Sequence, residues 1–161
     1  MNDAAPARLT HLDEARRALM VDVSAQAVRV RPATASGRVL LSADAVAALR
    51  DGTVPKGDAL AVARIAGITG AKRTPDLIPL CHPLAIHGVS VDLTVEDSGV
   101  AITASVRTAD RTGVEMEALT SVSVAALTLI DMIKSVDKGA VITDVRLEAK
   151  DGGRSGTWRR A

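Results

Sequence analysis

The sequence predicts an α+β fold, in which an antiparallel sheet is covered on one face by helices. Residues 89–95 and 100–106 alternate apolar and polar side chains with a period of two, and the polar segment 96–99 between them predicts a tight turn. A long apolar segment from Thr112 to about Val136 lacks this alternation and predicts a helix. Strands and helices do not alternate strictly along the chain, so a parallel βαβ sheet is not expected.

Length and composition favour one domain. The 161 residues suit a single core, and we expect an N-terminal tail at 1–10, a catalytic domain at 11–150 and a Gly-rich, basic tail at 151–161. Twenty Lys and Arg against 19 Asp and Glu give a net charge of +1. The overall charge of the protein therefore does not favour binding to nucleic acid or to a membrane surface. Trp158 is the sole aromatic residue of the Phe, Trp and Tyr types, which argues against base stacking.

The cellular compartment is expected to be the cytoplasm. One cysteine permits no intrachain disulfide, and neither a signal segment nor a long apolar span stands out. These features are typical of a soluble intracellular protein.

The first predicted element is an irregular β-hairpin. Residues 21–30 alternate imperfectly, Ser36-Gly37 reads as a turn, and 38–41 reads as the returning strand. A short helix at 43–50 should follow, since Ser42 is a suitable N-cap and Gly52 a suitable end.

The second predicted helix begins after Asp58, which can cap it, and ends near Lys72 and Arg73, whose charges complement the helix dipole. Thr74-Pro75 then predicts one further short turn. The same two cations have a second interpretation as phosphate ligands, and the pattern does not choose between the two.

The long helix is predicted to start with a capping box formed by Thr112 and Glu115. A last half-buried strand is expected at 141–147, where apolar and polar residues alternate again.

The segment 72–83 concentrates the scarcest reactive side chains. Cys81 and His82 lie between Pro79 and Pro83. The two prolines restrict the backbone, so the segment is predicted to be a loop of limited conformational freedom. Cys81 has three interpretations: a small buried apolar residue, a nucleophile without a recognisable base, or a metal ligand with His82 and His87. We favour His82 as a substrate-facing group.

The long helix also carries a sparse polar stripe. An exposed helix surface usually bears more charge, so the stripe is interpreted as a pocket wall or subunit contact, with a solvated face as the alternative. Lys56 precedes a helix start, where it could hold phosphate or be an ordinary surface lysine. The stripe comprises Glu117, Ser121, Thr128, Asp131 and Ser135, with Lys134 beside Asp131.

Two long blocks are specific enough to indicate a family: Asp-Leu-Ile-Pro-Leu-Cys-His-Pro at 76–83 and Arg-Thr-Gly-Val-Glu-Met-Glu-Ala-Leu-Thr at 111–120. With shorter segments they resemble molybdenum cofactor biosynthesis protein C (MoaC), the cyclic pyranopterin monophosphate synthase family, from Leu9 to Gly156. The shorter segments are 9–11, 20–25, 56–58, 61–67, 72–74, 123–127, 131–132 and 152–153.

The resemblance implies a phosphorus–oxygen lyase on a ferredoxin-like fold. Such an enzyme converts (8S)-3′,8-cyclo-7,8-dihydroguanosine 5′-triphosphate, a GTP-derived small molecule, to cyclic pyranopterin monophosphate and diphosphate. It also implies a homohexamer, a trimer of dimers, with sites at subunit interfaces. No redox cofactor is implied, and whether Mg²⁺ accompanies the diphosphate stays open.

The site residues implied by the resemblance fall into three groups. Lys56, Asp131 and Lys134 form the catalytic group. Leu80, Cys81, His82, Met116 and Glu117 contact substrate, and Arg31, Lys72 and Arg73 are partners for the triphosphate. The chain departs from the family at Asp110, where Gly is common, and at Arg154, where Lys is usual.

Two other function classes are compatible with parts of the sequence. The local basic clusters would also suit a non-catalytic module that binds anions or nucleotides. Cys81, His82 and His87 would suit a metal-dependent hydrolase, although their spacing is irregular.

Overall fold

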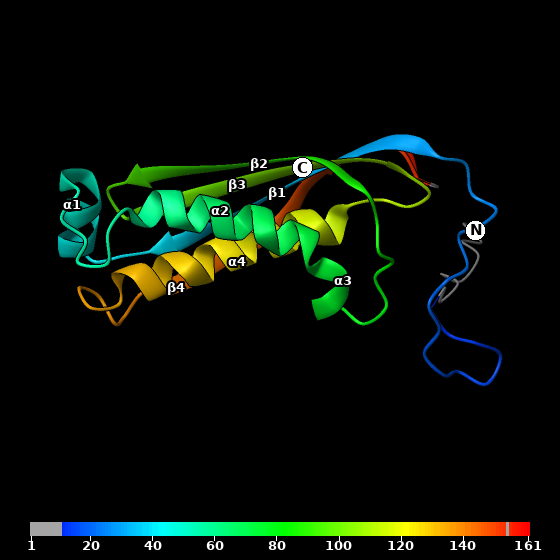
Figure 1. The fold of residues 1–161 in the computed structure, drawn as a ribbon, viewed down its shortest axis with the longest axis horizontal. Coiled ribbons are helices and arrows are strands. Elements are labelled where there is room, and N and C mark those ends of the chain that lie inside the picture. The colour runs from blue at the N-terminus through cyan, green and yellow to red at the C-terminus, as the bar shows by residue number, and fades with distance from the viewer. Residues whose placement is uncertain (1–10, 154) are drawn as a thin grey trace, which may run out of the picture.

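A computed structural model describes residues 11–153 and 155–161 (Figure 1). The expectations for the tail at 1–10 and for Arg154 fall outside these residues. The elements in chain order are β1 Arg29–Leu40, α1 Ala43–Asp51, α2 Ala59–Lys72, α3 Thr74–Leu77, β2 Ile86–Glu96, β3 Gly99–Asp110, α4 Glu115–Ile133, β4 Val141–Lys150 and β5 Trp158–Arg159.

The strands form one antiparallel sheet in the order β2-β3-β1-β4-β5. The path β1-α2-β2-β3-α4-β4 is the βαββαβ arrangement of ferredoxin-like folds. Both α2 and α4 lie against the same face of the sheet (Figure 1). The predicted α+β class and one-sided helix cover are therefore confirmed.

The core lies between that face and the two helices. Along β3, Val100, Ile102, Ala104 and Val106 are buried while the residues between them are more exposed, as the alternation predicted. Within the described chain α4 alone has the length and apolar character of a membrane span, but more than half of that segment is buried, as in a core helix.

The predicted hairpin at 21–41 is wrong, because β1 is one unbroken strand of 12 residues. Ser36 and Gly37 lie inside this strand and not at a turn. A Cβ on Gly37 would come within 2.8 Å of Val122 on α4, so the glycine permits close approach of helix and sheet. The segment before β1 extends away from the sheet (Figure 1).

Helix ends were predicted with mixed success. Ser42 caps α1 by accepting from the Ala45 N–H, and Asp58 caps α2 by accepting from the Ala61 N–H, as expected. The capping box is wrong: the N-cap of α4 is Val114, which has no side-chain oxygen, and its own side chain is buried. The helix also ends at Ile133 and not near residue 136.

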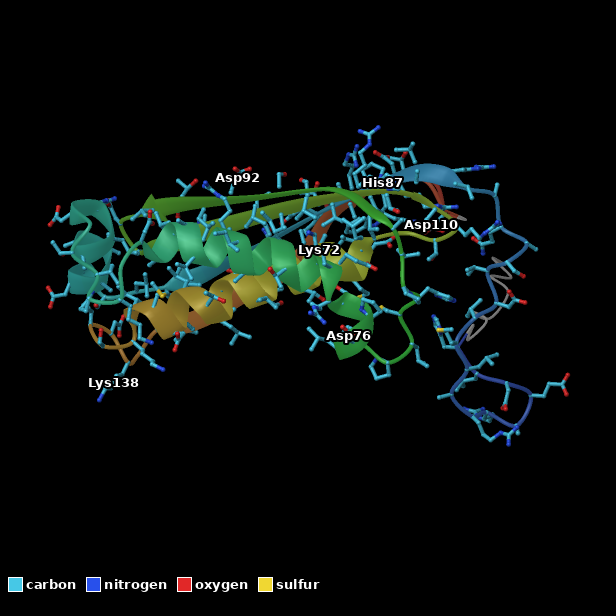
Figure 2. All side chains as sticks on the ribbon, in the orientation of Figure 1. Lys72, Asp76, His87, Asp92, Asp110 and Lys138 are labelled. Atoms are coloured by element: carbon cyan, nitrogen blue, oxygen red, sulfur yellow. The ribbon has the colours of Figure 1, made fainter. Side chains whose placement is uncertain are left out.

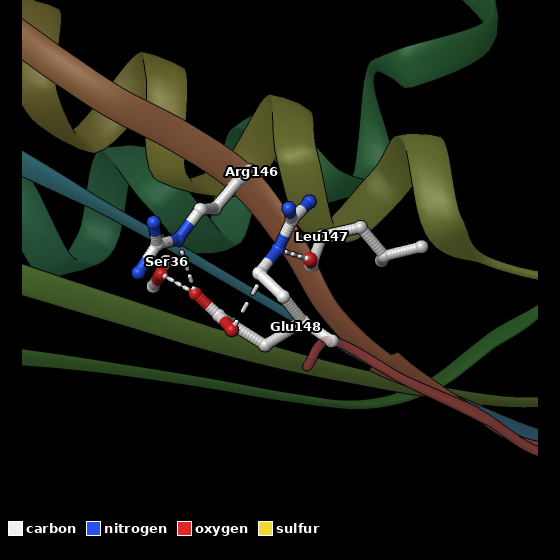
Figure 3. Close-up of polar contacts among 5 residues, drawn as sticks. Ser36, Arg146, Leu147 and Glu148 are labelled. Carbon is white, nitrogen blue, oxygen red and sulfur yellow. Dashed lines mark hydrogen bonds and ion pairs between the residues drawn. The ribbon is translucent and has the colours of Figure 1, made fainter.

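The segment 151–161, expected as a tail, contains β5, which pairs with the end of β4. Arg160, which follows β5, stabilises the pairing of β5 with β4 by donating from Nε to the Leu147 carbonyl at 2.8 Å. Beside it, the Glu148 carboxylate accepts from Ser36 on β1 and from Arg146 on β4 (Figure 3). Side chains thus link β1, β4 and the chain end on the sheet face that no helix covers.

Candidate active site

Three residues predicted as the catalytic group meet at the C-terminal end of α4. Asp131 lies in the last turn, Lys134 follows the helix, and Lys56 comes from the loop before α2. Lys134 Nζ donates to Asp131 Oδ1 at 2.8 Å, and Lys56 Nζ donates to Asp131 Oδ2 at 3.1 Å. The structure therefore brings this group together across 75 residues of sequence.

The two ammonium groups determine the charge of this carboxylate. Hydrogen bonds from Lys134, then from Lys56, lower the pKa of Asp131 below its ordinary value. All three side chains stay about half exposed, with exposed fractions from 42% to 56%. The group is therefore open to a substrate or to another chain, and its carboxylate is ionised at neutral pH.

A pocket of about 650 Å³ lies at the opposite end of α4, around its N-terminus. Six of the predicted substrate contacts line it: Arg31, Leu80, Cys81, His82, Met116 and Glu117. Further wall is supplied by Val21, Val23 and Gln26 from the segment before β1. With residues from the end of β4 and the loop after it, the described pocket lining comes from five parts of the chain.

The loop between α3 and β2 forms one wall of this pocket and carries Cys81 and His82. His82 Nε2 is hydrogen-bonded to the Val21 carbonyl, which attaches the N-terminal segment to the loop. Burial, then the Glu117 and Glu115 carboxylates, raise the pKa of the Cys81 thiol. A neutral thiol is a poor nucleophile, so Cys81 is better interpreted as pocket wall.

Glu117 is the most strongly perturbed group of the pocket. Its side chain is buried, with the residue only 3% exposed, and burial raises its pKa from 4.5 to about 7, with a smaller contribution from Glu115. A carboxyl that titrates near neutrality can both release and accept a proton under physiological conditions.

The predicted polar stripe on α4 is not one surface. Glu117 and Ser121 are buried near the start of the helix, whereas Asp131 near its end is exposed. Packing of α2 against α4 explains the difference, because Gly67 of α2 lies against the Ser121 backbone.

Among the residues that the structure describes, one arginine and one lysine line the pocket. Arg31 is 4% exposed and donates to the carbonyls of Asp110 and Ala27. Lys150 at the end of β4 was missed by the sequence analysis, yet it lines the pocket with its Nζ 4.0 Å from Glu115 Oε1. Nothing in the alternation of β4 distinguishes this lysine from a surface residue, so no signal in the pattern could have found it.

Lys72 and Arg73, the predicted phosphate partners, do not line the pocket. Both are exposed at the end of α2, and Arg73 Nη1 lies 3.4 Å from Asp76 Oδ2. Figure 2 shows Lys72 and Asp76 on the helix layer, apart from His87 and Asp110 at the end of the sheet. The structure of one chain therefore does not place this pair with His82.

The alternative metal site is not assembled. His87 is exposed, and its Nδ1 accepts from the Ala109 N–H at 3.2 Å, while His82 contacts Val21. Among residues 11–153 and 155–161, no three His, Cys, Asp or Glu side chains are grouped as metal ligands.

The two halves of the predicted site are far apart in one chain. Fourteen residues separate Glu117 from Asp131 on α4, and at 1.5 Å per residue this is about 21 Å along the helix. Figure 2 shows Asp110, before α4, and Lys138, after it, at opposite ends of the molecule.

Comparisons with known proteins identify the family. Residues 20–153 match the MoaC family. The chain is 70% identical over 154 residues to the cyclic pyranopterin monophosphate synthase of Streptomyces coelicolor, covering 96% of this chain and 91% of that protein. It is 65% identical to the Nocardioides enzyme of the same name, covering 99% of each.

A third relative is cyclic pyranopterin monophosphate synthase 2 of Mycobacterium tuberculosis, 58% identical over 99% of this chain and 95% of that protein. These matches extend over both the Lys56 group and the pocket. The chain belongs to the MoaC family.

Proposed function

We propose that this chain is a cyclic pyranopterin monophosphate synthase of molybdenum cofactor biosynthesis, working in the cytoplasm. Its substrate would be (8S)-3′,8-cyclo-7,8-dihydroguanosine 5′-triphosphate, and its products cyclic pyranopterin monophosphate and diphosphate. The observation that carries the proposal is the hydrogen-bonded group of Lys56, Asp131 and Lys134.

The residue types suit the chemistry. Opening the five-membered ring and reclosing it as a pterin requires proton transfers but no net oxidation or reduction. Lysines and a carboxylate held in contact can relay protons, and Glu117, with its pKa raised to about 7, can act as an acid or a base.

The cyclic phosphate forms by displacement. A substrate hydroxyl attacks the α-phosphate, its proton passes to a base, and the bond from the α-phosphorus to the bridging oxygen breaks as diphosphate leaves. Arg31 and Lys150, which line the pocket, can stabilise the charge on the departing diphosphate. No redox cofactor is required.

A complete site requires two chains in this proposal. The Lys56 group and the Glu117 pocket lie about 21 Å apart along α4, so one small substrate cannot reach both within one chain. The exposed apolar residues Leu19, Met20 and Val28 of the segment before β1 supply surface for a partner copy. We propose a homo-oligomer, a trimer of dimers, whose sites combine the two ends of α4 from neighbouring chains.

The test is turnover by purified protein. Fresh substrate should yield diphosphate and a pterin product, and Lys56→Ala should abolish product while substrate still binds in equilibrium dialysis. Lys138→Ala, an exposed lysine after α4, is the matched control and should turn over normally. Substrate binding without any product from the wild-type protein would support the anion-binding module instead.

A further inference from the structure

Asp110, the last residue of β3, uses one carboxylate to bind the residues that follow Leu84 and precede Thr112, two residues that line the pocket. Its Oδ2 accepts from the Ala85 N–H at 3.3 Å, and its Oδ1 accepts from the Arg111 N–H at 2.7 Å. We propose that Asp110 is a positioning residue that fixes the loop of Cys81 and His82 relative to the start of α4.

The loop side of this contact depends on side chains and not on the regular ladder. The pairing of β2 with β3 begins at Ile86 and Thr108, so Ala85 lies outside the ladder. Both peptide groups of Ala85 are instead held by β3 side chains, its carbonyl by the buried Thr108 hydroxyl and its N–H by Asp110. Asp110 therefore fixes the point at which the loop joins the sheet.

The helix side begins at Arg111. The Arg111 guanidinium donates to the carbonyls of Ser24 and Gln26, which belong to the segment that lines the pocket with Val21 and Val23. The Asp110 carbonyl also accepts from Arg31 Nε at 3.0 Å. Asp110 thus contacts the end of the loop, the turn before α4 and Arg31 directly, and it reaches the N-terminal segment through Arg111.

The chemistry of the side chain matters because both partners are donors. A carboxylate presents an acceptor to each N–H, whereas an amide has one acceptor oxygen and must turn its NH₂ group toward the other donor. Asp110→Asn therefore preserves volume and removes one of the two bonds, and Asp110→Ala removes both. Figure 2 shows Asp110 and His87 toward one end of the molecule and Lys138, after α4, at the opposite end.

This role deepens the proposed function, but it can be measured without turnover. Cys81 is the only cysteine in the chain, and it is half-buried in the loop. Its alkylation by iodoacetamide therefore reports how often the loop opens, whether or not the protein is the proposed enzyme.

The experiment compares Asp110→Asn and Asp110→Ala with wild type in the full-length protein. We expect Cys81 alkylation about threefold faster or more in both variants, because a loosened loop opens more often. We also expect KM for the cyclised substrate to rise while kcat changes less than about twofold, because substrate positioning and not the proton chemistry is affected. Asp92→Asn, an exposed carboxylate on β2, should match wild type in both measurements.

An unchanged alkylation rate in both Asp110 variants would overturn the positioning role, whatever their activity. Faster alkylation with an unchanged KM and a lower kcat would also overturn it, since that pattern describes a general loss of rigidity. Absence of turnover in wild type with faster alkylation in the variants would refute the proposed reaction while leaving the loop contact supported.

Discussion

Glu117 and Asp131 are acidic residues on the same helix whose surroundings shift their pKa values in opposite directions. Burial raises the pKa of Glu117 to about 7, and hydrogen bonds from Lys134 and Lys56 lower that of Asp131. Two carboxyl groups with separated pKa values are suited to different steps of proton transfer. Sequence analysis identified both residues, but it could not assign this difference, because burial depends on tertiary packing.

Glu117→Gln should lower kcat by about 100-fold, since it removes an acid–base group. The pH dependence of kcat/KM in the wild type should show a limb near pH 7 that the variant lacks. Product formation measured between pH 5 and 9 would check this. An identical pH limb in the variant would assign the titration to another group.

The same substitution should alter stability in a pH-dependent way. Because the folded-state pKa of Glu117 is raised from 4.5 to about 7, its contribution to stability is full below pH 4.5 and is lost as pH rises through 7. Glu117→Gln lacks this loss, so between pH 4.5 and a pH above 7 its stability relative to wild type should rise by on the order of 3 kcal/mol. Urea unfolding at pH 5 and pH 8 measures the difference, which should grow with pH.

Asp131→Asn should lower kcat by at least about 100-fold without destabilising the fold. The side chain is exposed, so its change should shift Tm by less than about 2 °C. Activity and thermal unfolding on the same sample would check both statements. A large fall in Tm would mean that the group is structural and not catalytic.

At the scale of elements, close packing of α2 on α4 depends on small residues. A Cβ on Gly67 would lie 3.1 Å from the Ser121 carbonyl oxygen, and one on Gly70 would lie 2.9 Å from Val124 Cβ. The sequence predicted both helices from their apolar residues. It did not predict which face of α4 is covered, and this is why the polar stripe was misread as one surface.

Gly70→Ala should lower the free energy of unfolding by about 1–2 kcal/mol, because overpacking outweighs the gain in helix propensity. Its neighbour Thr69→Ala, on the exposed side of α2, is the control and should be neutral or slightly stabilising. Urea titrations of the two variants make the comparison. A stabilised Gly70→Ala would show that α4 can move away from α2.

The errors at the element scale share a cause. Ser36-Gly37 has the composition of a turn and Thr112 to Glu115 has that of a capping box, yet tertiary contacts decide both places. Gly37 is required by Val122, and the buried Val114 begins α4. The hairpin of β2 and β3 was predicted correctly, because its alternation and turn are local and agree with each other.

At the scale of the whole molecule, the sequence identified residues of the site but not their distribution. Residues near Lys56 and residues near His82 lie at opposite ends of α4, and neither Lys72 nor Arg73 lines the pocket. Patterns in sequence carry no information on which chain supplies each wall. Lys150 escaped notice for a related reason, since its role depends on where β4 ends.

Two-chain sites predict complementation. Lys56→Ala and Glu117→Gln chains that are refolded together should recover about a quarter of wild-type activity. Half of the randomly formed dimers contain one chain of each kind, and one of the two sites in such a dimer is intact. Lys56→Ala mixed with Asp131→Asn should recover none, because both changes fall in the same half of each site. Recovery in neither mixture would indicate that each chain builds its own site.

Trp158 gives the molecule an optical property that follows from its place in β5. The chain has no tyrosine and no other tryptophan, so all of its near-ultraviolet emission comes from this ring. The ring lies 5.6 Å from the Arg160 guanidinium, and β5 follows the loop whose Gly153 and Ser155 line the pocket. Arrival of a ligand at this wall should therefore be visible as a change in intrinsic fluorescence, in real time and without a label.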